Sequence, residues 1–252
     1  MYPQIHLTDS IFISTYSLVY IIAILSGLLI AYLETRRYKI PLSVFPPAAF
    51  WTILCGIIGA KFFHIIFSKW NEFLQHPLDI LLRSSGWMYY GAEIGGIVGL
   101  VVYLKTKNLP LLRPLDIGAT VLLLAHAIGR VGCFLAGCCH GTACDASWCV
   151  TFPGMEHPVH PTQLYVSIPL FIAFVLVWIF RRKFAIPGLI FALYLIFYGS
   201  LRFFIDFYRA NMPYPGGWIF TPSQYIAPVM VVIGIGIILY LMRKKNEIRD
   251  KG

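Results

Sequence analysis

Charged residues are scarce in this chain: Asp, Glu, Lys and Arg make up only 12% of its 252 residues. A soluble domain averages about 25% charged and about 45–50% apolar residues, whereas 58% of this chain is hydrophobic. The composition excludes an ordinary soluble domain and predicts a membrane protein. The net charge of +9 lies in clusters between apolar runs, so no nucleic-acid partner is expected.

The sequence also lacks a low-complexity linker, an obvious internal repeat, and a basic segment followed by a small-residue cleavage site near its start. We therefore expect one transmembrane domain over residues 1–252, whose first span is an uncleaved anchor. The missing repeat argues against a transporter, because many transporters are built from repeated halves.

Seven apolar segments are long enough to cross a hydrocarbon core about 30 Å thick, which takes about 20 helical residues. The predicted spans are Ile11–Leu33, Pro47–Phe67, Trp87–Leu104, Leu115–Ala136, Thr162–Phe180, Gly188–Phe207 and Ser223–Met242. Most of the 20 basic residues fall in alternate loops, and basic loops stay in the cytoplasm. The predicted fold class is an all-α polytopic membrane protein with seven transmembrane helices, an outside amino terminus and a cytoplasmic carboxyl terminus.

Five of the charged residues inside these spans call for an explanation, because each costs about 2.5 kcal/mol or more and normally faces the bundle interior or a wet cavity. They are Lys61, Glu93, Arg130, Arg202 and Asp206. Two of the arginines lie towards the outer ends of their spans, and a guanidinium fork suits a phosphate group. The sequence therefore predicts a clamp for a lipid phosphate.

The arginines share helical faces with other polar residues. His126, Arg130 and Cys133 follow i, i+4, i+7 spacing, and so do Arg202, Asp206 and Arg209. A simpler interpretation is that Asp206 only neutralises Arg202 or Arg209 by i, i+4 or i, i+3 pairing and that Arg130 pairs with Glu93. The two interpretations are compatible, because a partly paired arginine still binds phosphate.

Five of the six cysteines cluster around a predicted small extracytoplasmic segment, residues 137–161. They are Cys133, Cys138, Cys139, Cys144 and Cys149. In an oxidising compartment this cluster predicts disulfides, with the vicinal pair bonded to Cys144 and Cys149 and with Cys133 left free. A thiol with a chemical role and a metal site are alternatives. The spacing fits no standard zinc pattern, so neither a metal ion nor a cofactor is predicted.

Polar residues also lie at the outer ends of the fifth and seventh spans. His160, Gln163 and Tyr165 precede or open the fifth, and Thr221 to Gln224 open the seventh. They are candidates for binding a lipid headgroup, or else they cap the helices. On the third span, Gly91, Gly95 and Gly99 form a small-residue stripe, which we interpret as helix packing.

Several motifs together resemble those of the prolipoprotein diacylglyceryl transferase family. The matching segments are Gly59–Lys61, Gly129–Gly137, His160–Tyr165, Tyr198–Arg209 and Ser223–Gln224. The resemblance implies seven membrane helices with an outside amino terminus, in the bacterial cytoplasmic (inner) membrane. It implies transfer of a diacylglyceryl group from phosphatidylglycerol to a cysteine of a prolipoprotein signal sequence, with release of glycerol phosphate.

The resemblance also implies roles for individual residues. Arg130 and Arg202 would hold the phosphate, and Tyr90, which stands where the family has a histidine, would complete the catalytic set. The implied lipid- or substrate-binding residues are Lys61, His160, Gln163, Tyr165, Asp206, Arg209 and Gln224. The expected partners are phosphatidylglycerol, a prolipoprotein signal sequence or another thiol acceptor, and membrane lipids.

The chain departs from the family signature beside Arg130. The signature usually continues G-N-F-x-N-G-E, and here Cys133 and Ala136 replace the asparagines and Cys138 replaces the glutamate. These changes favour two alternatives: a divergent relative that transfers a lipid group to another acceptor, or a thiol- or metal-binding membrane protein that is not an enzyme.

Overall fold

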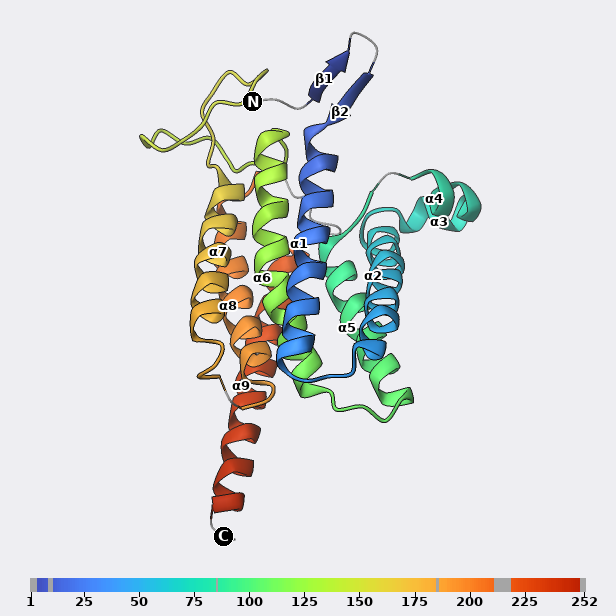
Figure 1. Ribbon diagram of the computed structural model, residues 1–252. Helices are drawn as coiled ribbons and strands as arrows, with labels where there is room; N and C mark the ends of the chain where they lie inside the picture. Colours follow the sequence, from blue (N-terminus) through green and yellow to red (C-terminus); the bar gives the residue numbers. More distant parts are fainter. Residues whose placement is uncertain (1–3, 9–10, 85, 185, 211–218, 250–252) are drawn as a thin grey trace. The chain divides into compact units, whose positions relative to one another are not determined.

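The computed structural model describes residues 4–8, 11–84, 86–184, 186–210 and 219–249 (Figure 1). Two strands are followed by nine α-helices among these residues: β1 (Gln4–Thr8), β2 (Ile11–Ser14), α1 (Thr15–Arg37), α2 (Phe45–Ser68), α3 (Trp70–Gln75), α4 (Pro77–Arg83), α5 (Tyr89–Thr106), α6 (Leu112–Leu135), α7 (Thr162–Phe180), α8 (Leu189–Ile205) and α9 (Pro222–Arg249). Short 3-10 turns, η1 (Leu42–Val44) and η2 (Asp206–Tyr208), precede α2 and follow α8.

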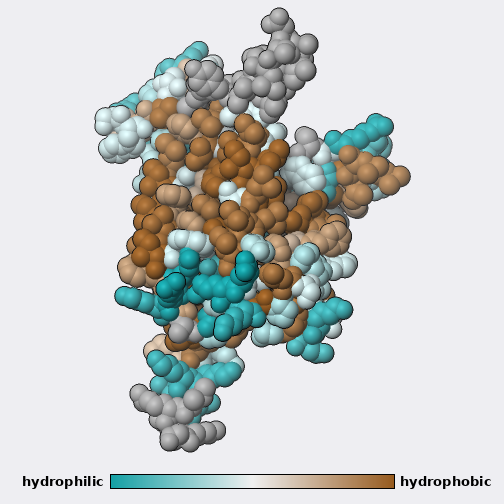
Figure 2. Space-filling view, viewed as in Figure 1, coloured by the Kyte–Doolittle hydropathy of each residue, from teal (hydrophilic) through white to brown (hydrophobic). Residues whose placement is uncertain are grey.

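Six helical segments of the described chain are long and apolar enough to cross a membrane. They are Thr15–Arg37, Leu42–Ser68, Leu112–Leu135, Thr162–Phe180, Leu189–Tyr208 and Pro222–Glu247. Large apolar side chains such as Leu25 and Ile58, each 59% exposed, cover these helices, and Figure 2 shows broad hydrophobic surface on the face in view. So much exposed apolar surface requires lipid tails around it. The chain is a multi-pass membrane protein.

The first helix begins later than predicted. Ile11–Ser14, assigned to the first span from sequence, forms strand β2 and pairs antiparallel with β1. Alternating β-branched and aromatic residues favour a strand there, so α1 begins only at Thr15. Among the residues that the structure describes, the helices and strands are all helical apart from this hairpin.

The segment between α2 and α5 holds two short helices that were not predicted. Pro77 opens α4 at the first helical turn, where its missing N–H costs nothing. The predicted third span corresponds to α5, which contains four glycines, Glu93 and Lys105. These residues lower its mean hydropathy, and α5 is not among the six apolar segments.

The chain divides into two compact units, which are described separately here. The first comprises the described residues of Met1–Leu33, Asp116–Pro213 and Ile219–Gly252, and the second those of Glu34–Leu115 and Tyr214–Trp218. The prediction of one domain over the whole chain stays a prediction.

In the second unit, α2 and α5 lie side by side with their backbones in contact (Figure 1). A Cβ atom added at Gly59 would lie 2.2 Å from the carbonyl oxygen of Gly91, and one at Gly95 would lie 2.3 Å from that of Cys55. Only glycine allows so close an approach, which small-residue stripes provide in membrane helices.

We expect Gly59→Ala to lower the free energy of unfolding by about 1–3 kcal/mol. The added methyl group would overlap backbone atoms of α5, which cannot move aside by a side-chain rotation. Unfolding of the purified protein by dodecyl sulfate in mixed micelles measures this loss. Gly118→Ala is the matched control, since a Cβ there meets nothing within 4 Å. Equal stability of the two variants would contradict the backbone contact.

In the first unit, Asp116 joins α6 to the start of α8. Its carboxylate oxygens accept hydrogen bonds from the backbone N–H groups of Gly188, at 2.8 Å, and Phe191, at 3.0 Å. The first N–H groups of a helix have no acceptor within the helix. Here the Asp116 side chain, which is only 1% exposed, accepts hydrogen bonds from two of them. Asp116 was not among the predicted functional residues, although an acidic residue inside an apolar span is a usable signal.

We expect Asp116→Ala to destabilise the protein by about 1–3 kcal/mol, because two buried N–H groups lose their acceptor. Asp116→Asn should lose less, because its amide oxygen can still accept one of the two bonds. Thermal unfolding in detergent compares the three proteins. An alanine variant as stable as the asparagine variant would mean that the carboxylate does not hold the two helices together.

Candidate functional site

A buried ion pair lies at the carboxyl end of α8. The Arg202 guanidinium contacts the Asp206 carboxylate at 2.7 Å, and their side chains are 4% and 0% exposed. Arg209 lies 3.8 Å from the same carboxylate oxygen. The i, i+4 and i, i+3 spacing brings all three side chains to one face of the helix. Asp206 therefore pairs closely with Arg202 and more distantly with Arg209, one of the two interpretations that the sequence left open.

The start of α9 packs against this ion pair. The Thr221 hydroxyl donates a hydrogen bond to Asp206 Oδ2 at 2.6 Å, and Arg202 donates to the Ser223 hydroxyl at 3.4 Å. Thr221 and Gln224 also cap α9 reciprocally: the Gln224 N–H donates to Thr221 Oγ1 at 3.1 Å, and the Thr221 N–H donates to Gln224 Oε1 at 3.0 Å. This is a capping box, so Gln224 supports the helix that holds the ion pair in place.

Arg130 lies on α6 and is half-buried. Its Nε donates to Nε2 of His126 one turn earlier, at 3.3 Å, and the His126 ring packs edge-on against Tyr198 of α8 at 5.0 Å. Burial lowers the pKa of Arg209, and the positive charges of Arg202 and Arg130 lower it further. The three guanidinium groups thus lie within electrostatic reach of one another, and Asp206 contacts two of them, Arg202 and Arg209.

The end of α6 brings two cysteines together. The Cys138 N–H donates to the Cys133 carbonyl at 3.1 Å, and the Gly137 N–H donates to the Phe134 carbonyl at 3.1 Å. Gly137 has a φ of 73°. These are the hydrogen bonds of a Schellman motif, in which the side chains at the positions of Cys133 and Cys138 normally touch.

The segment His160–Gln163 holds the backbone that follows this turn. The Thr162 hydroxyl donates to the Cys139 carbonyl at 2.9 Å, and the fully buried Gln163 amide donates to the Cys138 carbonyl at 2.7 Å. The Gly141 N–H donates to the His160 carbonyl at 2.8 Å. Gln163, predicted to bind substrate, thus fixes the vicinal cysteines.

The disulfide prediction was wrong in its pairing. Cys144 bonds to Cys149, whereas Cys133, Cys138 and Cys139 are free thiols. The reason is that Gly137 and the turn after it direct the vicinal cysteines back to the end of α6, away from the loop that contains the other two.

The three free thiols form a compact group whose sulfur atoms lie within 4.8 Å of one another. Hydrogen bonds with Cys133 and Cys138 lower the pKa of the Cys139 thiol, and Arg209 and Arg130 lower it further. Hydrogen bonds with Cys133 and Cys139 raise the pKa of the Cys138 thiol. Cys139 is therefore the thiol of the group that ionises first.

His160 and Tyr165 lie together beside the disulfide loop. His160 Nδ1 is 3.1 Å from the Tyr165 hydroxyl, which also accepts a hydrogen bond from Trp148 Nε1 at 3.0 Å. The His160 ring packs edge-on against Tyr208, with ring centroids 5.1 Å apart. Trp148 and Tyr208 were not predicted as part of this region, because their contact with the motif arises only from folding of the loop.

Lys61, Tyr90 and Glu93 belong to the second unit. Lys61 on α2 donates hydrogen bonds to the Ser84 carbonyl and, at 3.0 Å, to the Ser84 hydroxyl, and lies 5.4 Å from the centre of the Trp87 ring. Tyr90 and Glu93 are buried on α5, 5% and 6% exposed. Lys61 thus anchors the segment that leads into α5.

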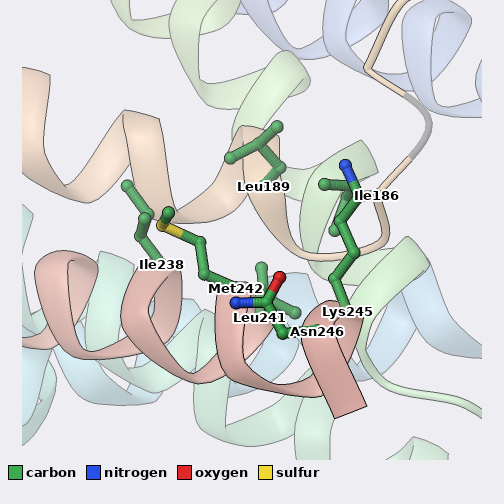
Figure 3. Close-up of a pocket in the computed structure, with 7 residues that line it drawn as sticks. All are labelled: Ile186, Leu189, Ile238, Leu241, Met242, Lys245 and Asn246. Carbon is green, nitrogen blue, oxygen red and sulfur yellow. The ribbon is translucent and has the colours of Figure 1, made fainter. Parts of the chain in front are cut away.

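A small cavity of about 230 Å³ lies at the other end of α8 from Arg202 (Figure 3). Its lining residues are Ile186, Leu189, Ile238, Leu241, Met242, Lys245 and Asn246. Leu189 precedes Arg202 by 13 residues, a helical rise of about 20 Å. This cavity is therefore separate from the arginine cluster.

The chain is similar to one known family over almost its whole length. The family model for prolipoprotein diacylglyceryl transferase matches residues 4–240. The phosphatidylglycerol–prolipoprotein diacylglyceryl transferase of Clostridium tetani is 37% identical over 190 residues, which cover 73% of this chain and 75% of that protein. The protein of that name from Finegoldia magna is 30% identical over 237 residues, 93% of each chain, and the one from Chlorobaculum tepidum is 29% identical over 266 residues, 98% of this chain and 92% of that protein.

Proposed function

Because the chain belongs to the prolipoprotein diacylglyceryl transferase family, we propose that it transfers the diacylglyceryl group of phosphatidylglycerol to a prolipoprotein cysteine. The observation that carries the proposal is the cluster of Arg130, Arg202 and Arg209 at adjoining helix ends. The cluster brings three positively charged guanidinium groups together at one end of these helices. A lipid phosphate matches that charge and the planar geometry of the guanidinium group.

The topology belongs to the same proposal. Helix α5 crosses the membrane as a seventh span in addition to the six apolar segments. Basic residues lie in the last turn of α1, at Arg36 and Arg37, and near the carboxyl end of α9. These two helix ends therefore face the cytoplasm. The amino terminus and residues 137–161 then lie outside the bacterial cytoplasmic membrane, and the arginine cluster lies in its outer half.

In the reaction, the acceptor sulfur attacks the diacylglyceryl carbon that bears the phosphate. A C–S bond forms, the C–O bond to phosphate breaks, and glycerol phosphate leaves with the bonding electrons while the thiol proton passes to a base. Arg130 and Arg202 stabilise the charge on the departing phosphate. His126 orients Arg130 through their hydrogen bond, and Asp206 orients Arg202.

The other family positions complete the proposed site. Tyr90 keeps its proposed catalytic role on the strength of the family resemblance alone, and its side chain is buried on α5. His160 and Tyr165 form the polar surface that contacts the lipid headgroup, and Arg209 adds charge to it. Lys61, Gln163 and Gln224 keep the surrounding segments in position. Lys61 donates a hydrogen bond to Ser84, Gln163 donates to the Cys138 carbonyl, and Gln224 caps α9.

A transfer assay in liposomes tests the proposal. Phosphatidylglycerol labelled in its acyl chains is supplied with a peptide that carries a prolipoprotein cysteine motif, and the thioether-linked label is measured. Label on the cysteine of that peptide supports the proposal. Matched peptide with serine in place of cysteine must remain unlabelled. A folded protein that labels no cysteine peptide in phosphatidylglycerol liposomes would refute it.

A second acceptor is favoured by one observation. Cys133 and Cys138 replace family residues directly after Arg130, so the surface that meets the acceptor differs from the signature. Transfer to a small-molecule thiol, while the peptide with the prolipoprotein cysteine motif stays unlabelled in the same liposomes, would identify a transferase whose acceptor has changed.

A further inference from the structure

We propose that Cys133, Cys138 and Cys139 bind one soft, thiophilic metal ion, copper(I). The proposed transfer reaction makes no use of these three thiols. The inference does not depend on that reaction, because its test measures bound metal rather than transfer.

The sulfur atoms already have the spacing that a shared metal ion requires. They lie within 4.8 Å of one another, and the three cysteines are free thiols. Metal–thiolate bonds of about 2.3 Å in a trigonal arrangement place the sulfur atoms about 4 Å apart. Small rotations of the side chains therefore suffice to bring three ligands onto one ion.

The backbone that carries the ligands is held in place before any metal binds. The Schellman turn at Gly137 sets Cys133 against Cys138. Cys139 has a φ of 64°, a left-handed conformation that costs energy for a residue with a side chain and is typical of functional positions. Thr162 and Gln163 hold the carbonyl groups of the vicinal pair from α7.

The ligand set favours copper(I) over other metals. Thiolates are soft ligands that select copper(I), zinc and iron–sulfur clusters, and structural zinc takes four ligands. Among the described residues, the group of closely spaced ligands contains these three cysteines and no fourth Cys, His or carboxylate. Cys144 and Cys149 are joined in a disulfide, which removes them as ligands.

The surroundings also suit a site with excess negative charge. Three thiolates and one monovalent ion carry a net charge of −2, which an apolar environment would penalise. Arg209 and Arg130 both act electrostatically on Cys139, and they offset this charge. Cys138 and Cys139 are exposed at the surface of the structure, so an ion can enter.

Copper(I) titration of the full-length protein in detergent tests the proposal. The protein is isolated anaerobically, and copper(I) is added in competition with bicinchoninate. We expect one equivalent to be retained, and X-ray absorption of the wild-type protein to show three sulfur neighbours around copper. Cys133→Ser, Cys138→Ser and Cys139→Ser should each lose the retained equivalent, whereas Cys55→Ser, at a free cysteine on α2, should keep it.

Three results would overturn the proposal. The first is copper retained in full by the three serine variants. The second is a sulfur count below three around copper in the wild-type protein, a measurement that does not depend on whether the variants fold. The third is a disulfide between two of the three cysteines, found by mass spectrometry of protein alkylated without reduction. Retention of zinc(II) with no retention of copper(I) would overturn the assignment of the metal.

Discussion

Replacing Arg130 by alanine is expected to lower the turnover of diacylglyceryl transfer by about 10²- to 10³-fold, the usual cost of removing one donor that stabilises a developing anion. Arg130 is half-buried, and among the described residues its side chain donates a hydrogen bond to His126. Removing the Arg130 side chain takes no partner away from a buried carboxylate in the described contacts, so the variant should fold. Turnover with labelled phosphatidylglycerol, measured beside thermal unfolding, separates the two effects.

Two further variants sharpen this experiment. Arg83→Ala removes an arginine whose side chain is 84% exposed, and its turnover should match the wild type. Arg130→Lys keeps the charge but loses the planar fork that binds two phosphate oxygens, so its turnover should fall between the other two. A folded Arg130→Ala protein with near-normal turnover would remove Arg130 from the phosphate site.

Removing the carboxylate of Asp206 is expected to have the largest effect on stability. Asp206→Ala leaves Arg202 buried beside its missing partner, and breaking one side of a buried ion pair costs about 3–5 kcal/mol. The Thr221 hydroxyl also loses its acceptor. Dodecyl sulfate unfolding in mixed micelles measures the lost free energy of unfolding.

The double variant Arg202→Met with Asp206→Leu distinguishes stability from catalysis. Replacing both members of a buried ion pair by apolar side chains is often neutral or stabilising, so the double variant should recover most of the stability that Asp206→Ala loses. Transfer activity should not recover, because the phosphate ligand is absent. Recovery of both would show that Arg202 serves only to pair with Asp206, and no recovery of stability would show that Ser223 and Thr221 need the charged groups.

The cysteine cluster shows how a local backbone rule decided a pairing that residue types left open. Counting cysteines in the segment predicted bonds from Cys138 and Cys139 to Cys144 and Cys149, which was wrong. The glycine at position 137 was a usable signal, because a helix that ends in glycine commonly forms a Schellman turn and brings its flanking side chains together. Applied to the sequence, that rule alone predicts that the side chains of Cys133 and Cys138 touch.

The sequence by itself determined the membrane class and most of the helices. Lipid requires long apolar segments with internally satisfied backbones, and that requirement is written in composition and length. The same cost marks charged residues within spans, so Arg130, Arg202 and Asp206 could be identified as candidates before folding was considered. Their i, i+4 spacing also indicated the contact between Arg202 and Asp206.

Only the tertiary structure decided which distant segments meet. The contact of Thr221 with Asp206 and that of Gln163 with the Cys138 carbonyl join residues 15 and 25 positions apart, and Asp116 reaches α8 across 72 positions. Neither periodicity nor composition encodes such pairs, because each depends on how whole helices pack. Helix packing in turn is set by close backbone approach, as at Gly59 and Gly91, and this geometry exists only after the chain has folded.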